Sequence, residues 1–169
     1  MKQITALLTL LVISLSPVLQ AEDRFNTYGV FYDISYSGAD AITIQQKTTS
    51  TKVAVFLKLK VFCTADCIIQ VERDGTPATT TTQAIVAFSK NQPASSLAAF
   101  NASNVGSGTV IWKLYAVANT NYDFPLDGFK LPPGNQAGSA AAVSSVTFRI
   151  TSGGSPVVRM LPTWYEENQ

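Results

Sequence analysis

Residues 52–62 read KVAVFLKLKVF, and this stretch decides the fold. Its odd-numbered residues are all aliphatic, whereas three of its even-numbered residues are Lys. Such alternation is typical of a β-strand, because successive residues of a strand point to opposite sides. The stretch therefore predicts a strand whose odd-numbered face, with Val55 and Leu57, enters a core. The even-numbered face, Phe56 included, is expected to face water.

Two cysteines follow at once, Cys63 and Cys67, and the chain has no others. Residues 68–73 continue as a second strand, and Asp74 with Gly75 supplies residues that tolerate a positive φ. Residues 52–73 thus predict a β-hairpin whose loop is stapled by a Cys63–Cys67 disulfide. The alternatives are a redox pair or half of a metal site, but redox motifs have a two-residue spacing and the further ligands are missing.

The chain begins like a signal peptide. Lys2 precedes an apolar run over residues 4–19, and small or polar residues lead to Glu22. We expect cleavage after residue 21; the alternative is an uncleaved anchor, although the run is shorter than the roughly 20 residues that span a bilayer. Loss of Lys2 leaves eleven basic against eleven acidic residues, because the whole chain has twelve and eleven. The product is expected to be secreted, extracellular or at the cell surface, with no membrane span and no nucleic-acid partner.

Strand-like stretches recur along the rest of the chain. They favour β-branched and aromatic residues between turn clusters, and no convincing amphipathic helix separates them. This pattern predicts an all-β protein with an antiparallel β-sandwich, jelly-roll or immunoglobulin-like, in one domain over residues 47–169. Residues 22–46 form an N-terminal strand segment before it. The expected strands are 28–36, 41–46, 52–62, 68–73, 79–88, 96–100, 109–118, 143–151 and 156–161.

Composition excludes several kinds of catalysis. The chain has no His, which removes histidine triads and histidine-ligated zinc. Most carboxylates fall in predicted turns or near the termini, where short acidic side chains cap backbone amides. We therefore expect no enzyme, no cofactor and no metal. A calcium site is the alternative, if loop carboxylates converge in space; the candidates are Asp33, Asp40, Asp123 and Asp127.

Aromatic residues provide the contact candidates. Trp112 has the parity of two aliphatic neighbours and is predicted to lie in the core. Trp164 and Tyr165 follow a proline near the C-terminus and form either a plug in the sandwich or an exposed platform for a ligand. The long segment 125–142 is a predicted contact-making loop. Asn101 begins a formal N-glycosylation triplet.

The first strand of the processed chain is the informative feature for function. It is apolar on both faces, so it lies deep in a core or needs a second surface to cover it. The preferred hypothesis is a structural subunit that polymerises into a filament, with residues 22–46 added as a strand to a neighbouring copy. Its inter-subunit side chains would be Val30, Phe31, Tyr32, Ile34 and Tyr36.

The alternative hypothesis is a secreted binding module. It would use Trp164, Tyr165 and the 125–142 loop to hold a glycan or a partner on a cell surface. The partners expected from the sequence are therefore copies of the chain itself or, in the alternative, a cell surface or glycan.

Overall fold

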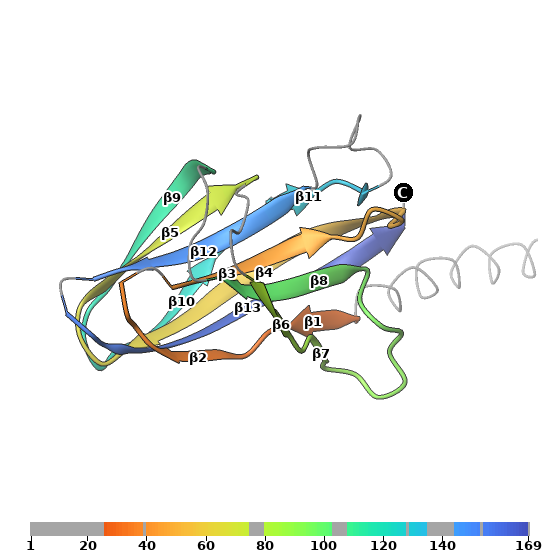
Figure 1. Cartoon of the computed structure of the whole chain (residues 1–169). Helices are drawn as coiled ribbons and strands as arrows, with labels where there is room; N and C mark the ends of the chain where they lie inside the picture. The colour runs from red at the N-terminus through yellow and green to blue at the C-terminus, as the bar shows by residue number, and fades with distance from the viewer. Residues whose placement is uncertain are drawn as a thin grey trace, which may run out of the picture.

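The protein is an antiparallel β-sandwich of two sheets, as the sequence predicts (Figure 1). The computed structural model describes residues 26–38, 40–74, 80–102, 108–127, 129–134, 144–152 and 154–168. The predicted signal peptide lies outside these residues. The seven-stranded sheet contains β1 (Thr27–Gly29), β2 (Tyr32–Ser35), β4 (Lys52–Cys63), β7 (Val86–Ala87), β10 (Asn121–Pro125), β11 (Lys130–Leu131) and β13 (Val157–Asn168). The six-stranded sheet contains β3 (Ala41–Gln46), β5 (Cys67–Arg73), β6 (Thr80–Gln83), β8 (Leu97–Ala102), β9 (Thr109–Ala116) and β12 (Ser145–Thr151).

The chain changes sheet at most connections. The strand order is β10-β4-β13-β1-β7 in one sheet and β6-β8-β3-β12-β5-β9 in the other. Strands β4 and β5 therefore lie in different sheets, and the predicted hairpin over residues 52–73 is wrong. Alternating side chains identify a strand, but they do not say which sheet it joins.

Most predicted strands match observed ones. The prediction for residues 41–46 coincides with β3, and Asp74, a predicted turn residue, has φ 58°. Strand β10 was missed, because Asn121 and Asp123 made the segment resemble a turn. The predicted strand 28–36 is divided into β1 and β2. Its register against β13 is the same on both sides of the gap, and the gap lies opposite Pro162, which has no N–H for the ladder.

A β-bulge changes the buried face of β4. Thr163 pairs with Lys58 and Trp164 pairs with Phe56, so Leu57 is an extra residue. Odd-numbered Leu59 and Val61 are buried as predicted, but Phe56 is fully buried and Leu57 is only half-buried. The prediction that Phe56 faces water is wrong, because the bulge shifts the alternation by one residue.

Aromatic rings connect the two layers through the core. The ring of Trp164 stacks on that of Tyr28, with centroids 6.1 Å apart, and lies 5.7 Å from that of Phe56. Phe56 contacts Phe148 of the six-stranded sheet at 6.4 Å. The Phe56 ring also packs edge to face on that of Phe129, with centroids 5.6 Å apart. These contacts tie β1, β4, β12 and β13 to one another.

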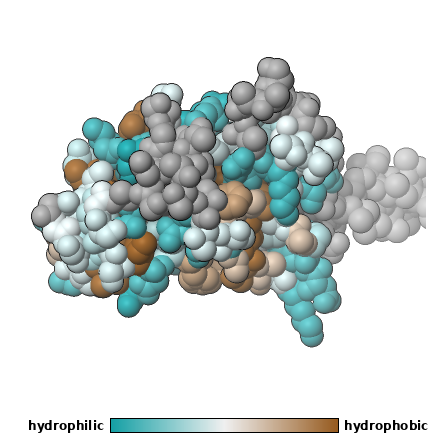
Figure 2. Space-filling view, viewed as in Figure 1, coloured by the Kyte–Doolittle hydropathy of each residue, from teal (hydrophilic) through white to brown (hydrophobic). Residues whose placement is uncertain are grey.

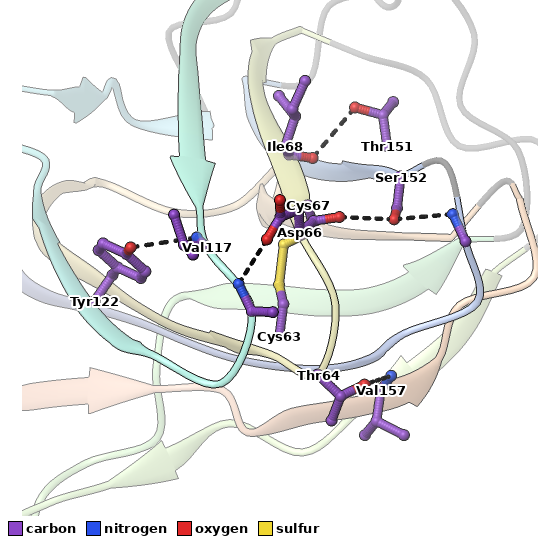
Figure 3. The surroundings of a disulfide bond; sticks show 12 residues. Cys63, Thr64, Asp66, Cys67, Ile68, Val117, Tyr122, Thr151, Ser152 and Val157 are labelled. Atoms are coloured by element: carbon purple, nitrogen blue, oxygen red, sulfur yellow. Dashed lines mark hydrogen bonds between the residues drawn. A yellow bond between two sulfur atoms is a disulfide. The ribbon is translucent and has the colours of Figure 1, made fainter.

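The disulfide joins the two sheets at one end of the sandwich. Cys63 is the last residue of β4 and Cys67 the first of β5, and both are buried (Figure 3). The predicted bond is present, but it clasps a corner between sheets. Asp66 in this corner accepts a hydrogen bond from the backbone N–H of Ala118 through Oδ1, and its carbonyl accepts one from the hydroxyl of Ser152 (Figure 3).

The opposite end is held by the carboxylate of Glu166 on β13. It accepts hydrogen bonds from the Ser95 hydroxyl and from the Ser96 N–H, which lie just before β8 of the other sheet. Lys52 Nζ is 3.8 Å from the same carboxylate. The sandwich is thus closed by a covalent bond at one end and by a buried polar cluster at the other.

Replacement of Phe56 tests the bulge. Phe56→Ala is expected to lower the free energy of unfolding by about 3–5 kcal/mol, because a fully buried ring leaves a cavity. Leu57→Ala should cost only about 1 kcal/mol, since Leu57 is half-buried. Urea unfolding of both variants measures the difference. A larger loss of unfolding free energy for Leu57→Ala than for Phe56→Ala would contradict the bulge.

Removal of the disulfide tests the corner. The double variant Cys63→Ala, Cys67→Ala should stay folded and lose about 2 kcal/mol, since a small ring removes little entropy from the unfolded chain. The hydrogen bonds of Asp66 hold the same corner without the sulfur bridge. Circular dichroism and urea unfolding measure both properties, and a variant without cooperative unfolding would show that the bond is indispensable.

Candidate functional site

A shallow hollow of about 570 Å³ lies on the seven-stranded sheet, near the disulfide end. It crosses four adjacent segments of chain, from β2 and the residue before it through β13 and β4 to β10. The alternate residues Tyr32, Val61 and Met160 are buried beneath it. The intervening residues therefore point outward from the sandwich and form the surface of the hollow.

Eight outward side chains form two rows across these four segments. We call them the outer-face site. The strand pairing places Arg159 between Asp33 and Phe62, and Lys60 between Leu161 and Asp123. The first row reads Asp33, Arg159, Phe62, Asn121, and the second reads Phe31, Leu161, Lys60, Asp123.

Phe31 is the most exposed apolar member of the site. Its side chain is 61% exposed, whereas its neighbours Val30 and Tyr32 are 0% and 3% exposed. The two neighbours use the core-facing positions of the strand, so the residue between them must point outward. The constant register of β1 and β2 against β13 places it opposite Leu161. An exposed ring therefore follows directly from the burial of its neighbours.

Arg159 contacts an acid and an aromatic ring on the outer face, and its side chain is 62% exposed. Its Nε donates to Asp33 Oδ2 over 3.0 Å, and its guanidinium carbon lies 5.8 Å from the centroid of the Phe62 ring. The guanidinium carries further N–H donors on its two terminal nitrogens. These two contacts favour one orientation of the exposed guanidinium.

Asp123 pairs with two lysines on the same face. Lys58 Nζ lies 3.0 Å and Lys60 Nζ 3.9 Å from Asp123 Oδ2. All three side chains are strongly exposed, and exposed ion pairs of this kind typically add only about 0.2–1 kcal/mol to stability. Stability of the fold therefore does not explain why these charges lie here.

Four of the five residues of the predicted inter-subunit strand are buried or half-buried in their own sandwich, and the fifth, Phe31, is exposed. Val30 and Tyr32 are buried, and so is Tyr36, whose exposed fraction is 8%. Ile34 is half-buried, and β2 pairs with β13 of the same chain. The segment predicted as a donor also includes β3, which lies between β8 and β12. The polymer hypothesis thus loses the uncovered strand from which it was derived.

The predicted aromatic positions divide in three ways. Trp164 is fully buried, so it is a plug in the sandwich and not an exposed platform. Tyr165 is half-buried and donates a hydrogen bond to Glu167 Oε1 over 3.0 Å. Trp112 is 38% exposed and packs edge to face on Phe129, with centroids 5.8 Å apart, which corrects its placement in the core. Trp112 does lie on the core-facing side of β9. Because β9 is the edge strand of its sheet, neighbouring strands cover Trp112 from one side only.

The calcium candidates do not gather at one point. Asp33 pairs with Arg159, and Asp40 Oδ2 accepts a hydrogen bond from the Ser37 N–H over 2.6 Å. Within the described part of the chain, no group of three or more His, Cys, Asp and Glu side chains could hold a metal ion. Asp123 has its two lysines, and Asp127 is exposed.

Two further polar side chains, Glu72 and Asn101, have partners within the structure. Glu72 on β5 is buried and pairs with Arg149 Nη2 at 3.1 Å. Burial raises the pKa of this carboxyl, and Arg149 partly opposes the shift. Asn101 Oδ1 accepts a hydrogen bond from the Tyr32 hydroxyl over 3.0 Å, between the two sheets. This contact turns the glycosylation candidate toward the sandwich interior.

Another exposed apolar patch lies near β7. Val86 and Phe88 are 38% and 47% exposed. Figure 2 shows hydrophobic side chains below the middle of the view, where Figure 1 draws β1 and β7. None of the described residues forms a helix long and apolar enough to cross a bilayer.

Comparison with known proteins adds no relative. No protein-family model, no curated protein and no solved structure matches this chain.

Sequence reasoning missed most of the outer-face site. Phe31 was singled out as an inter-subunit residue and Asp33 and Asp123 as calcium candidates, whereas Arg159 and Phe62 were not considered. The site combines four segments that are far apart in the sequence, so its signal is the register of the sheet. Alternation could have predicted that Phe31 is exposed, because a residue between two buried neighbours of a strand faces outward.

Tyr32 provides a test of the buried first strand. Burial, and then the nearby Asp40, raise the pKa of its phenol above the usual 10.0. The neutral phenol is thus favoured in the folded state, so its contribution to stability is present below pH 10 and is lost as the pH rises further. Wild-type protein should lose more stability than Tyr32→Phe between about pH 8 and pH 11 in urea unfolding. Tyr115→Phe is the control, because Tyr115 is 65% exposed; equal slopes for all three would contradict the burial.

Proposed function

We propose that the protein is a secreted, non-enzymatic binding module that holds an extracellular ligand on its outer-face site. The single observation that carries this proposal is the exposed ring of Phe31 in the same hollow as the guanidinium of Arg159, which contacts Asp33 and Phe62. Ligand sites combine apolar area with a few fixed polar groups, and this hollow does so.

Secretion is supported by two independent features. The first 21 residues have the order of a signal peptide, with Lys2 before the apolar run. The Cys63–Cys67 bond is of the kind that persists in oxidising compartments outside the cytosol.

The lack of an evident reaction centre favours binding over catalysis. The chain has no His, and the acids in the hollow are paired with cations. Glu72 and Glu166 are engaged in buried structural contacts. Each of these carboxylates has a cationic or hydrogen-bonding partner.

The sheet edges favour a monomeric binder over a polymer built by strand addition. Edge strands resist pairing when they are short, bulged or charged. Strand β9 has a bulge at Ile111 and a charge at Lys113, and β10 contains Asp123 and Pro125. The other described edges, β2, β6, β7 and β11, have four residues or fewer. Polymer formation is therefore an outcome for experiment to reveal, not the function proposed.

Adsorption to immobilised extracellular polymers tests the proposal. The panel includes polysaccharides and extracellular proteins, and the bound fraction of purified protein is measured on each. Wild-type protein should adsorb to at least one surface, and Phe31→Ala should lose most of that adsorption, because the exposed ring contributes contact area without supporting the core.

The matched control is Tyr115→Ala. Tyr115 is 65% exposed, close to the 61% of Phe31, but it lies on β9 of the other sheet. The Tyr115→Ala variant should adsorb as the wild-type protein does. Absence of adsorption throughout the panel, or equal loss in the two variants, would contradict the proposal.

A further inference from the structure

We infer that the outer-face site binds a neutral, unsubstituted glycan chain, with the apolar face of a sugar ring against Phe31. This inference rests on the proposed function and specifies its ligand class. It follows from three properties of the site: its charge balance, its dimensions and its mixture of hydrogen-bonding groups.

The charges of the site lie in pairs, which disfavours a charged ligand. The hollow holds two cations, Arg159 and Lys60, and two anions, Asp33 and Asp123, and Lys58 beside it adds a third cation, 3.0 Å from Asp123. Each cation lies within 4 Å of one of the anions, at 3.0 Å for Arg159 with Asp33 and 3.9 Å for Lys60 with Asp123. A sulfate or carboxylate that approached Arg159 would also approach Asp33, and the repulsion would cancel much of the attraction.

The dimensions suit an extended chain. The site crosses four segments of one sheet, at a spacing of about 4.8 Å between strands, and its two rows are two residues apart along each strand, or about 7 Å. The surface is thus about twice as long as it is wide. The hollow of about 570 Å³ is within the usual range for ligand sites. A short oligosaccharide laid across the strands matches this outline better than a single compact molecule does.

The hydrogen-bonding groups match hydroxyls. A hydroxyl both donates and accepts, and it needs partners of both kinds nearby. Arg159 and Lys60 donate, Asp33 and Asp123 accept, and the exposed amide of Asn121 does both. Phe31 supplies an aromatic face, whose negative charge density attracts the C–H groups on the flat side of a pyranose ring.

The arrangement assigns distinct tasks to Phe31 and Arg159. Phe31, in the outermost segment, provides the platform for one ring. Arg159, in contact with Asp33 and Phe62, presents its planar fork of donors toward the next ring.

Calorimetry on the full processed chain tests the ligand class. The probes are neutral oligosaccharides of glucose, mannose, xylose and N-acetylglucosamine, with a heparin fragment as the anionic comparison. At least one neutral series should bind, and its affinity should change little with salt, because no net charge is neutralised. Phe31→Ala should weaken that binding by about tenfold, and Phe31→Trp should retain it.

Two variants separate the parts of the site. Arg159→Lys keeps the charge but lacks the planar fork, and it should weaken binding by about tenfold. Tyr115→Ala should bind as wild type does, because Tyr115 lies on the other sheet. The thermal unfolding of each variant is recorded first, so that only folded proteins are compared.

Results that contradict the ligand class can be told apart from results that contradict the proposed function. Tighter, salt-sensitive binding of the heparin fragment would overturn the neutral class. So would neutral binding that Phe31→Ala leaves intact. If no oligosaccharide binds but an immobilised protein is held through Phe31, the ligand class is wrong and the binding module stands. If neither binds, both are wrong.

Discussion

The structure depends on the packing of Trp164 between Tyr28 and Phe56. The Trp164 and Tyr28 rings belong to β13 and β1, and Phe56 belongs to β4, which reaches Phe148 in the opposite sheet. These ring contacts hold β1 against β13 and join the seven-stranded sheet to the six-stranded sheet. Because Tyr28 is drawn inward, the alternation along the strand also draws Val30 and Tyr32 inward and turns Phe31 outward. The core and the outer-face site are thus two consequences of one register.

Local sequence predicted the strands well and their partners poorly. Alternation is a local property, so both ends of β3 could be predicted, and Leu59 and Val61 could be placed in the core. Sheet membership depends on the path of the whole chain, which is why the hairpin over residues 52–73 was wrong. The bulge at Leu57 is set by the pairing of β4 with β13, more than a hundred residues away along the chain.

The same limit applies to the candidate site. Its members were seen separately, Phe31 as a subunit contact and Asp33 as a calcium candidate, because their neighbours come from β13, β4 and β10. Trp112 shows the complementary error: its parity was read correctly, but only the sheet order reveals that β9 is an edge. The aromatic-rich first strand suggested a missing partner molecule, whereas the partner is β13 of the same chain.

Native-state hydrogen exchange tests most directly whether the molecule completes its own core. The backbone amides of β1 and β2 that pair with β13 are measured at the lowest and at the highest workable protein concentration. These amides should exchange as slowly as those of β13 at both concentrations, since the strand is sheltered within one chain. Rapid exchange in dilute protein, with protection only when copies associate, would contradict it.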